Sequence, residues 1–167
     1  VTTNQGGSPV KVKGSAIDGS VFADGKISAI KSDSKVSGDV EADGNISELS
    51  ESAIGGYVKT LSGSDGSIDT VQDLTVGGDI AADGAISELK QSDVGGCVTV
   101  GGNIEEINGS TVVGGVETTD GGNVKIKQNS IVGDHVHAAG NVHAGRVRGG
   151  DGLAHGLGVE PAGEQPR

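Results

Sequence analysis

Short stretches of alternating apolar and polar residues recur along most of the chain. Each follows the pattern V-x-G-x-V-x-A, with Ile or Thr replacing Val or Ala in some copies. Seven copies occur, and they begin at Ile17, Val36, Ile54, Val76, Val94, Val112 and Val132. The starts lie 19, 18, 22, 18, 18 and 20 residues apart. Alternation with a period of two predicts short β-strands, and the regular spacing predicts a stack of similar units.

A second apolar pair follows most copies about ten residues after the start. It reads Ile27/Ile30, Ile46/Leu49, Ile86/Leu89 and Ile104/Ile107, is displaced to Ile68/Val71 and Val124/Ile126 in the third and sixth copies, and leaves Val142 in the last. Between the two apolar segments lies a corner, usually Asp-Gly: Asp24-Gly25, Asp43-Gly44, Asp65-Gly66, Asp83-Gly84 and Asp120-Gly121. Because Gly accepts positive φ and Asp caps a bend, we expect turns there. The insertion Leu61-Ser62-Gly63-Ser64 falls at one such corner.

These patterns predict an all-β fold, a single-stranded β-solenoid (β-helix) of about seven coils with an 18–19 residue period. Equivalent positions would stack about 4.8 Å apart, giving a rod about 34 Å long. We expect an N-terminal segment and partial first coil over residues 1–13, the solenoid over 14–149, and an irregular C-terminal tail or cap over 150–167. Gly fills the third place in six of the seven copies and would let the coils pack closely there.

Composition supports a narrow core. The 167 residues include 32 Gly but one Phe, one Tyr, no Trp and no Met, so an ordinary globular domain with interlocking large side chains is excluded. The single cysteine, Cys97, cannot form an internal disulfide, and no zinc-finger spacing occurs. No apolar run approaches about 18 residues, so we expect no membrane span. No targeting segment is visible at Val1, which favours a cytoplasmic filament or a virion as the setting.

The charge is strongly acidic. Asp and Glu number 23 against 12 Lys and Arg, for a net charge of −11. Nucleic acids and anionic lipid surfaces would be repelled, so we expect neither as a partner. All four His and all three Arg lie in residues 131–167, which sets the C-terminal end apart chemically.

Two stretches resemble a known family. Val-Ser-Gly-Asp-Val-Glu-Ala at 36–42 and Val-Gly-Gly-Asp-Ile-Ala-Ala at 76–82 are similar to the repeated coil of the bactofilins, bacterial cytoskeletal proteins. The resemblance spans roughly residues 10–148. It implies a right-handed β-helix that polymerises without nucleotide. Phage tail spikes, fibres and capsid-decorating proteins carry similar Gly/Val ladders, often as intertwined trimers, so a virion component is the alternative.

Candidate contact residues occupy outward places of the repeat. Phe22 and Tyr57 would be exposed aromatics on a rod otherwise made of Gly, Asp, Ser and Lys, and we expect them to contact partners or to be covered by neighbouring segments. Cys97 lies outward between Gly96 and Val98. It is a reactive thiol, an intermolecular link or an inert thiol, and the lack of an adjacent His or basic residue that would lower its pKa favours the inert thiol.

The His-x-His pair is the candidate metal site. His135 and His137 flank inward Val136 and should project from one outer strand face. In a three-fold assembly, three such pairs could make a six-coordinate transition-metal site. Without that assembly, they are two solvated histidines. The same two residues are also candidate contact residues.

No catalytic set is apparent. The phosphate-binding pattern G-x-x-x-x-G-K-[ST] is missing, and no Ser-His-Asp or Cys-His arrangement can be assigned. The corner aspartates Asp24, Asp43 and Asp83 would form a column that either binds a divalent cation or serves its own turns. We therefore expect no cofactor and no enzymatic activity. The predicted function is self-assembly into a filament or scaffold, with other structural proteins as possible partners of the C-terminal tail.

Overall fold

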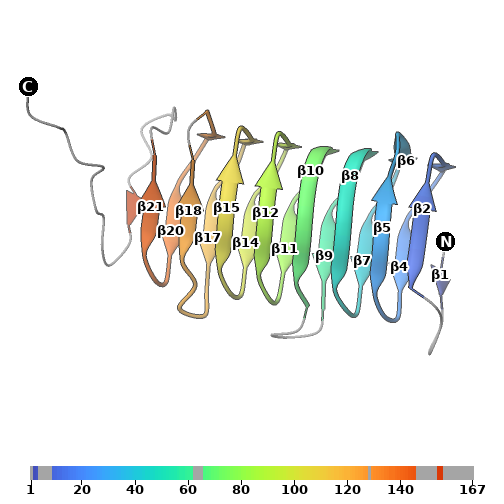
Figure 1. Cartoon of the computed structure of the whole chain (residues 1–167), viewed down its shortest axis with the longest axis horizontal. Helices are drawn as coiled ribbons and strands as arrows, with labels where there is room; N and C mark the ends of the chain where they lie inside the picture. Colours follow the sequence, from blue (N-terminus) through green and yellow to red (C-terminus); the bar gives the residue numbers. More distant parts are fainter. Residues whose placement is uncertain (1, 4–8, 62–65, 128, 146–153, 156–167) are drawn as a thin grey trace, which may run out of the picture.

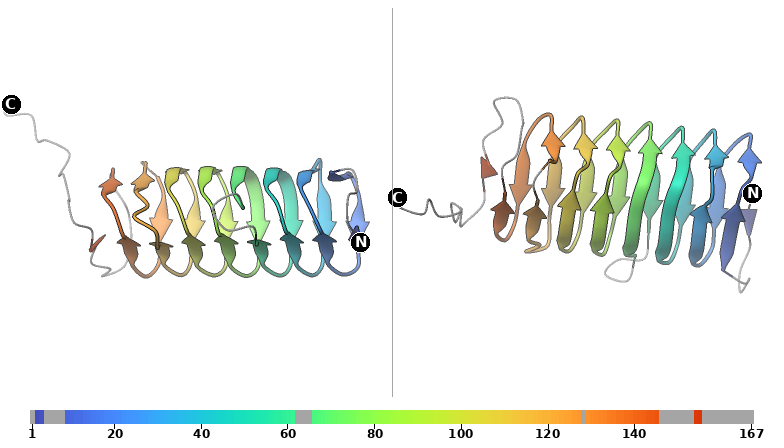
Figure 2. Two further views of the ribbon diagram at one scale, coloured as in Figure 1. Left: turned by 90° about the horizontal axis from the view of Figure 1, so that it is seen from below. Right: turned by 45° about the horizontal axis from the view of Figure 1, so that its top comes forward.

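The computed structural model describes residues 2–3, 9–61, 66–127, 129–145 and 154–155. Every regular element in this part of the chain is a β-strand, and all strand pairs are parallel. The coils stand side by side in one row, with β2 near one end and β21 near the other (Figures 1 and 2). The predicted all-β solenoid of about seven coils is confirmed. No described helix is long and apolar enough to span a membrane.

Each coil contributes strands to three parallel ladders. The first ladder contains the V-x-A strands. Its members are β1 (Thr2–Thr3), β4 (Val21–Ala23), β7 (Val40–Ala42), β9 (Val58–Thr60), β11 (Ile80–Ala82), β14 (Val98–Val100), β17 (Val116–Thr118), β20 (Val136–Ala138) and β22 (Ala154–His155).

The second ladder contains the later apolar pairs and the third contains the short strands that precede the glycines. The second consists of β2 (Val10–Lys13), β5 (Ile27–Lys31), β12 (Ile86–Lys90), β15 (Ile104–Asn108), β18 (Val124–Ile126) and β21 (Val142–Ala144). The third consists of β3 (Ala16–Ile17), β6 (Ser34–Val36), β13 (Asp93–Val94), β16 (Thr111–Val112) and β19 (Ile131–Val132). The nine-residue strands β8 (Ile46–Ile54) and β10 (Ile68–Val76) run through both ladders.

Insertions leave the stacking register intact. Ile68 is the partner of both Ile46 and Ile86, although 22 residues separate it from the first and 18 from the second. Val124 pairs with Ile104 across a local register shift. Both displaced apolar pairs therefore occupy the core places that the repeat assigns to them.

The core is a column of aliphatic side chains. The largest fully buried residues are Ile27, Ile30, Ile46, Leu49, Ile54, Ile68, Leu74, Ile80, Ile86, Leu89, Ile104 and Ile107. Neither aromatic residue belongs to it. The buried polar residues are Ser34, Thr60, Ser92, Ser110, Thr118 and Ser130. Among the described residues, no buried side-chain nitrogen or oxygen lacks a hydrogen-bond partner, as close-packed interiors require.

Glycines let the coils approach where the third ladder turns into the first, a bend that we call the glycine corner. A Cβ added to Gly114 would lie 2.6 Å from Cys97 Sγ and 2.9 Å from the Gly96 carbonyl oxygen. One added to Gly78 would lie 3.1 Å from the Gly56 carbonyl oxygen. The expectation that third-place glycines allow close packing is therefore confirmed for Gly38, Gly56, Gly78, Gly96 and Gly114, whereas nothing lies within 4 Å of a Cβ added to Gly19.

The Asp-Gly corners differ from the sequence-based expectation. Of the described ones, only Gly121 has a positive φ, 75°. Gly25, Gly44 and Gly84 do not, so the positive-φ explanation is wrong for them. At Gly44 the reason is again space, because an added Cβ would lie 3.2 Å from the Gly25 carbonyl carbon.

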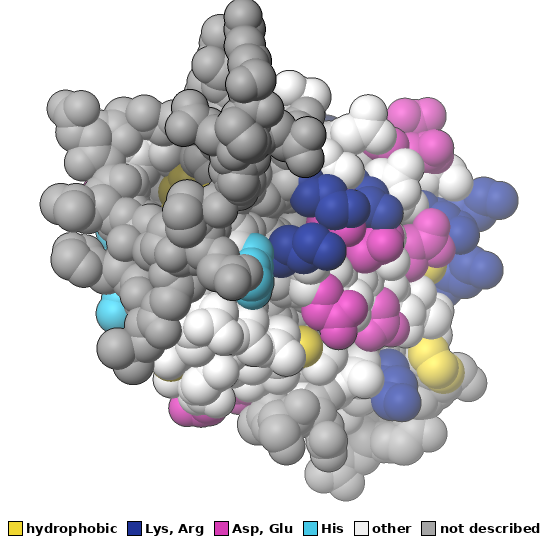
Figure 3. All heavy atoms as spheres, turned by 60° about the vertical axis from the view of Figure 1, so that its left-hand side comes forward, with side chains coloured by type: hydrophobic (Ala, Val, Ile, Leu, Met, Phe, Trp, Pro, Cys, Tyr) yellow, Lys and Arg dark blue, Asp and Glu magenta, His cyan; other side chains and the backbone are white. Residues whose placement is uncertain are grey.

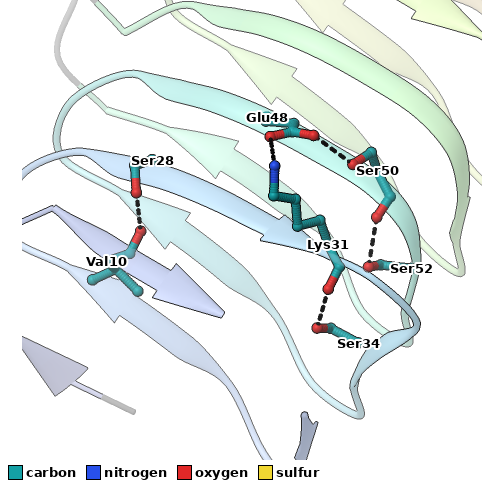
Figure 4. A network of polar contacts seen from close by, with 7 residues as sticks. All are labelled: Val10, Ser28, Lys31, Ser34, Glu48, Ser50 and Ser52. Atoms are coloured by element: carbon teal, nitrogen blue, oxygen red, sulfur yellow. Dashed lines mark hydrogen bonds and ion pairs between the residues drawn. The ribbon is translucent and has the colours of Figure 1, made fainter. Parts of the chain in front are cut away.

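Left-handed residues make the bend between the second and third ladders, which we call the serine corner. Each coil has a residue with φ between 46° and 65° there: Gly14, Asp33, Glu51, Asp73, Gln91, Gly109 and Asn129, with Ser32 (61°) as a second one before Asp33. A serine follows in most coils and returns a hydrogen bond to the preceding chain. Ser34 Oγ donates to the Lys31 carbonyl at 2.6 Å and Ser52 Oγ to the Ser50 carbonyl at 2.7 Å (Figure 4).

Candidate interaction surfaces

Two columns of outward residues contain all the predicted contact residues. The corner column is the residue that precedes each first-ladder strand: Ser20, Asp39, Tyr57, Asp79, Cys97, Gly115 and His135. The face column is the central residue of each three-residue strand of the first ladder: Phe22, Glu41, Lys59, Ala81, Thr99, Glu117 and His137. Tyr57, Cys97 and His135 share the first column, while Phe22 and His137 share the second.

The shared columns do not bring these residues into one patch. Phe22 and His137 are six rungs apart in the face column, which is about 29 Å at 4.8 Å per rung. Phe22 is 40% exposed at the start of the rod. The predicted residues thus mark separate positions along the rod.

Tyr57 is held against the preceding coil. Its hydroxyl donates to Glu41 Oε2 at 3.0 Å, and its backbone N–H donates to Asp39 Oδ1 at 3.1 Å. The hydrogen bond to the Glu41 carboxylate raises the pKa of the Tyr57 phenol above 10.0. The side chain is half-buried, so it offers a partner less aromatic surface than the sequence suggests.

Cys97 is exposed and forms no disulfide. Its backbone N–H donates to Asp79 Oδ1 at 2.8 Å, and its thiol lies beside Gly114 of the next coil. The aspartate before it in the corner column thus orders the turn, as Asp39 does for Tyr57. An accessible thiol at this place can meet another copy of the chain.

The His135 ring lies against Gly115 of the preceding coil, which has no side chain. Its Nδ1 is 3.0 Å from Asp134 Oδ2, and its ring occupies the space where Gly115 would carry a Cβ. His135, which precedes β20, and His137 within it are both exposed, while Val136 between them is half-buried. The searched, described residues contain no group of three His, Cys, Asp or Glu arranged to hold a metal.

The corner aspartates form a broken column. Asp24 and Asp43 occupy neighbouring rungs, because the Asp43 N–H donates to the Ala23 carbonyl. Leu61 takes the next rung, since its N–H donates to the Ala42 carbonyl, and it separates Asp43 from Asp83. The expected stack of three carboxylates is therefore interrupted by an apolar side chain.

A groove of 610 Å³ lies beside Asp83 at this corner. Ala81, Gly84 and Gly101 contribute small residues to its lining, together with the carboxylates of Asp83 and Asp120. No lysine, arginine or histidine is among its described lining residues.

Three exposed apolar residues were not found from the repeat. Leu61, Val113 and Ile131 are 38%, 62% and 43% exposed. Val113 stacks between Gly95 and Gly133, so it occupies a position at which both neighbouring coils have glycine. An alignment of the coils by repeat position would have identified Val113 from the sequence.

Lysines pair with carboxylates along the second ladder. Three ion pairs form there: Lys31 with Glu48 at 2.7 Å, Lys90 with Glu88 at 2.8 Å, and Lys127 with Glu106 at 2.6 Å. Hydrogen bonds from the lysines lower the pKa of Glu48 and Glu106, and the bond to Glu88 raises that of Lys90. Lysine or arginine side chains lie among acidic ones near the C-terminal end (Figure 3). This mixture differs from a continuous basic surface for nucleic acid.

At the N-terminal end of the rod, the described strands leave one edge without a partner strand. Within the described chain, β2 pairs only with β5 and β3 only with β6. The Val10 N–H donates to the Lys26 carbonyl in the next coil. Because successive residues of a strand bond to opposite sides, the N–H and C=O of Lys11 face the end of the rod.

The C-terminal end presents the complementary edge. Among described strands, β21 pairs only with β18 and β19 only with β16. The Val124 N–H donates to the Asn141 carbonyl in the last coil. By the same register, the N–H of Val142 points beyond that coil. Both ends therefore offer backbone groups that suit another parallel strand.

Comparison with known proteins adds no relative to this geometry. Protein-family models, curated proteins and solved structures were each searched, and none matches the chain. The likeness that the structure itself establishes is to β-solenoids as an architecture.

Proposed function

We propose that this chain is a non-catalytic structural protein that assembles end to end through its solenoid, as its resemblance to the bactofilins implies. The observation that carries the proposal is the pair of unpaired edges: β2 and β3 at one end, β19 and β21 at the other, within the described residues. Strand edges of this kind are templates for pairing with another chain.

The two edges fit each other because the coils are alike. Val124 reaches Asn141 in the following coil, and Pro9 holds the place in the first coil that Asn141 holds in the last. The Val142 N–H would thus meet the Pro9 carbonyl of a second copy. Head-to-tail stacking of this kind continues the second ladder in parallel and covers apolar ends such as Val10 and Val142.

Charge along the sides favours growth at the ends. The net charge of −11 makes two rods repel when they lie side by side, and salt weakens that repulsion. We therefore expect single filaments at low salt and lateral bundles at high salt. Contacts at Phe22, Cys97 and His135 would act in those bundles.

The test is a concentration series of the full chain, followed by light scattering after size exclusion and by negative-stain imaging. We expect filaments about 3–4 nm wide whose length grows with concentration. Lys11→Pro removes an edge N–H at the open end and should leave short particles. Lys11→Ala removes the same charge but keeps that N–H, so it should still form filaments.

Two outcomes would overturn the proposal. A monomer at all concentrations would mean that the ends are covered in solution. A discrete trimer that resists salt would instead support a virion spike, fibre or decoration protein. Filaments that form equally well with Lys11→Pro would show that assembly does not use the β2 edge.

A further inference from the structure

The second ladder contains two forms of strand. In its middle strands the two buried apolar residues are three positions apart: Ile27/Ile30, Ile46/Leu49, Ile68/Val71, Ile86/Leu89 and Ile104/Ile107. In β2 and β18 they are two positions apart, at Val10/Val12 and Val124/Ile126. The register therefore shifts where the two forms meet, between β2 and β5 and between β15 and β18. β21 continues the short form, because it pairs with β18 without a shift.

The two ends of the rod thus carry second-ladder strands of the same form. Placing β2 of a second copy on β21 needs no register shift, and the partners are then Val142 with Val10, His143 with Lys11, and Ala144 with Val12. The Lys11 N–H of the second copy would donate to the Val142 carbonyl, and the Lys11 carbonyl would accept from the Ala144 N–H. This register rests on the end-to-end assembly proposed above and defines the contacts at its junction.

In this junction His143 lies between two lysines. Lys125 is its register partner within the chain, and Lys11 of the second copy becomes its partner on the other side. Neighbouring rungs are about 4.8 Å apart, and like charges directly opposite each other weaken strand pairing. We propose that protonation of His143 regulates self-association: a neutral imidazole lets β2 of a second copy pair with β21, and an imidazolium repels it.

The immediate surroundings of His143 are cationic. β18 contributes Lys125, which is exposed, and is followed by Lys127, whose ammonium pairs with Glu106 at 2.6 Å. The nearest carboxylates of the described second ladder, Glu105 and Glu106, lie on β15, two rungs from β21. β20 also contacts β21, and its one titratable side chain, His137, lies in the face column of the first ladder. A second copy would add Lys11 and Lys13 from β2.

Short strands at the two ends of the first ladder compete for one rung. β1 precedes β2 in the first coil as β20 precedes β21 in the last, so β1 of a second copy would take the place on β20 that β22 holds. Both strands are two residues long and each pairs with one described strand. Exchanging one for the other breaks few backbone bonds, and the junction therefore depends mainly on the second ladder.

The experiment measures the critical concentration for filament formation of the full chain by light scattering at pH 6.0, 7.0 and 8.0, at one low ionic strength. Imidazole gains its proton in this range. Because the junction disfavours the protonated form, assembly should strengthen as the pH rises, and the critical concentration should be about two- to fivefold higher at pH 6.0 than at pH 8.0. His143→Gln should remove this difference, and His137→Gln, the matched control on the first ladder, should keep it.

Lys11→Glu tests the contact from the other side of the junction. A carboxylate opposite an imidazolium attracts it, so this variant should assemble better at pH 6.0 than at pH 8.0, whereas Lys11→Ala should assemble equally at both. If Lys11→Glu keeps the pH dependence of the natural sequence, or if the natural sequence has none, regulation by His143 is wrong while end-to-end assembly stands. If no filaments form at any pH, the proposed function itself fails.

Discussion

Two corners of the same coil use glycine for different reasons. At the glycine corner, Gly114 is needed because a Cβ would meet the Gly96 carbonyl and the Cys97 thiol. At the serine corner, Gly109 has a φ of 63°, and the nearest atom to an added Cβ is Gln91 Cγ at 3.8 Å. The first position is limited by the neighbouring coil, whereas the second is limited by the residue's own backbone.

The difference explains which residues can replace glycine. A left-handed backbone tolerates Asn and Asp at moderate cost, and the serine corner indeed holds Asp33, Asp73 and Asn129 beside Gly109. A close approach of two backbones tolerates no Cβ. Four changes break or sharpen this comparison, and they follow in order of decreasing expected effect.

Gly114→Ala should have the largest effect. The new methyl would force two stacked coils apart at the Gly96 carbonyl, which should cost about 2–3 kcal/mol of unfolding free energy. Urea denaturation followed by circular dichroism measures it. Gly121→Ala is a useful control, since nothing lies within 4 Å of a Cβ there although its φ is 75°. Equal losses in both variants would show that coil spacing is not the cause.

Ser92→Ala should come next. Its buried hydroxyl donates to the Lys90 carbonyl at 2.7 Å and accepts from the Leu74 N–H at 3.2 Å, and removing it should cost about 2 kcal/mol. Ser52→Ala, at the same corner, loses a donor to the Ser50 carbonyl from a half-buried position. The same urea series should show the smaller loss for Ser52→Ala, and the reverse order would contradict a role for burial.

Gly109→Ala should cost about 1 kcal/mol, because an L-residue with a side chain is strained at this φ without any clash. Gly109→Asn should be nearly neutral. Thermal melts of the two variants and the natural sequence separate backbone strain from crowding. If Asn proved as harmful as Ala, space rather than φ would limit this position as well.

The smallest effect is expected for Glu41→Gln, which changes a hydrogen bond on the outer side of the glycine corner. Because the Glu41 carboxylate raises the pKa of Tyr57, the hydrogen bond between them stabilises the fold below pH 10.0 and is lost as the pH rises through the higher folded value. Tyr57 is the single tyrosine and no tryptophan is present, so absorbance near 295 nm reports its ionisation directly. Glu41→Gln should bring the midpoint down towards 10.0, and an unchanged midpoint would exclude this carboxylate as the cause.

Much of the fold could be predicted because the core residues themselves recur with the period of the repeat. Ile46, Ile68 and Ile86 keep their rungs through an insertion, and apolar periodicity alone found them. The serine corner escaped because its left-handed residues include Glu51 and Gln91, side chains that give no sign of positive φ. Its geometry follows from stacking on neighbouring coils, which the local sequence does not encode.

The interaction surfaces were only partly predictable. Outward alternation identified Phe22 as exposed. It could not show that the Tyr57 hydroxyl donates a hydrogen bond to the Glu41 carboxylate, since that contact joins two coils. The strand β22 escaped because the sequence after Gly149 carries no repeat, and its place emerges only from its pairing with β20.

The pairing of consecutive coils fixes how far this chain can reach. Between Ile86 and Ile104, 18 residues advance the rod by one rung, about 4.8 Å, whereas 18 residues of α-helix would extend about 27 Å. A single molecule is therefore a poor spacer for its mass. The residues instead build the cross-section of the rod, so the filament proposed above would gain length by adding molecules.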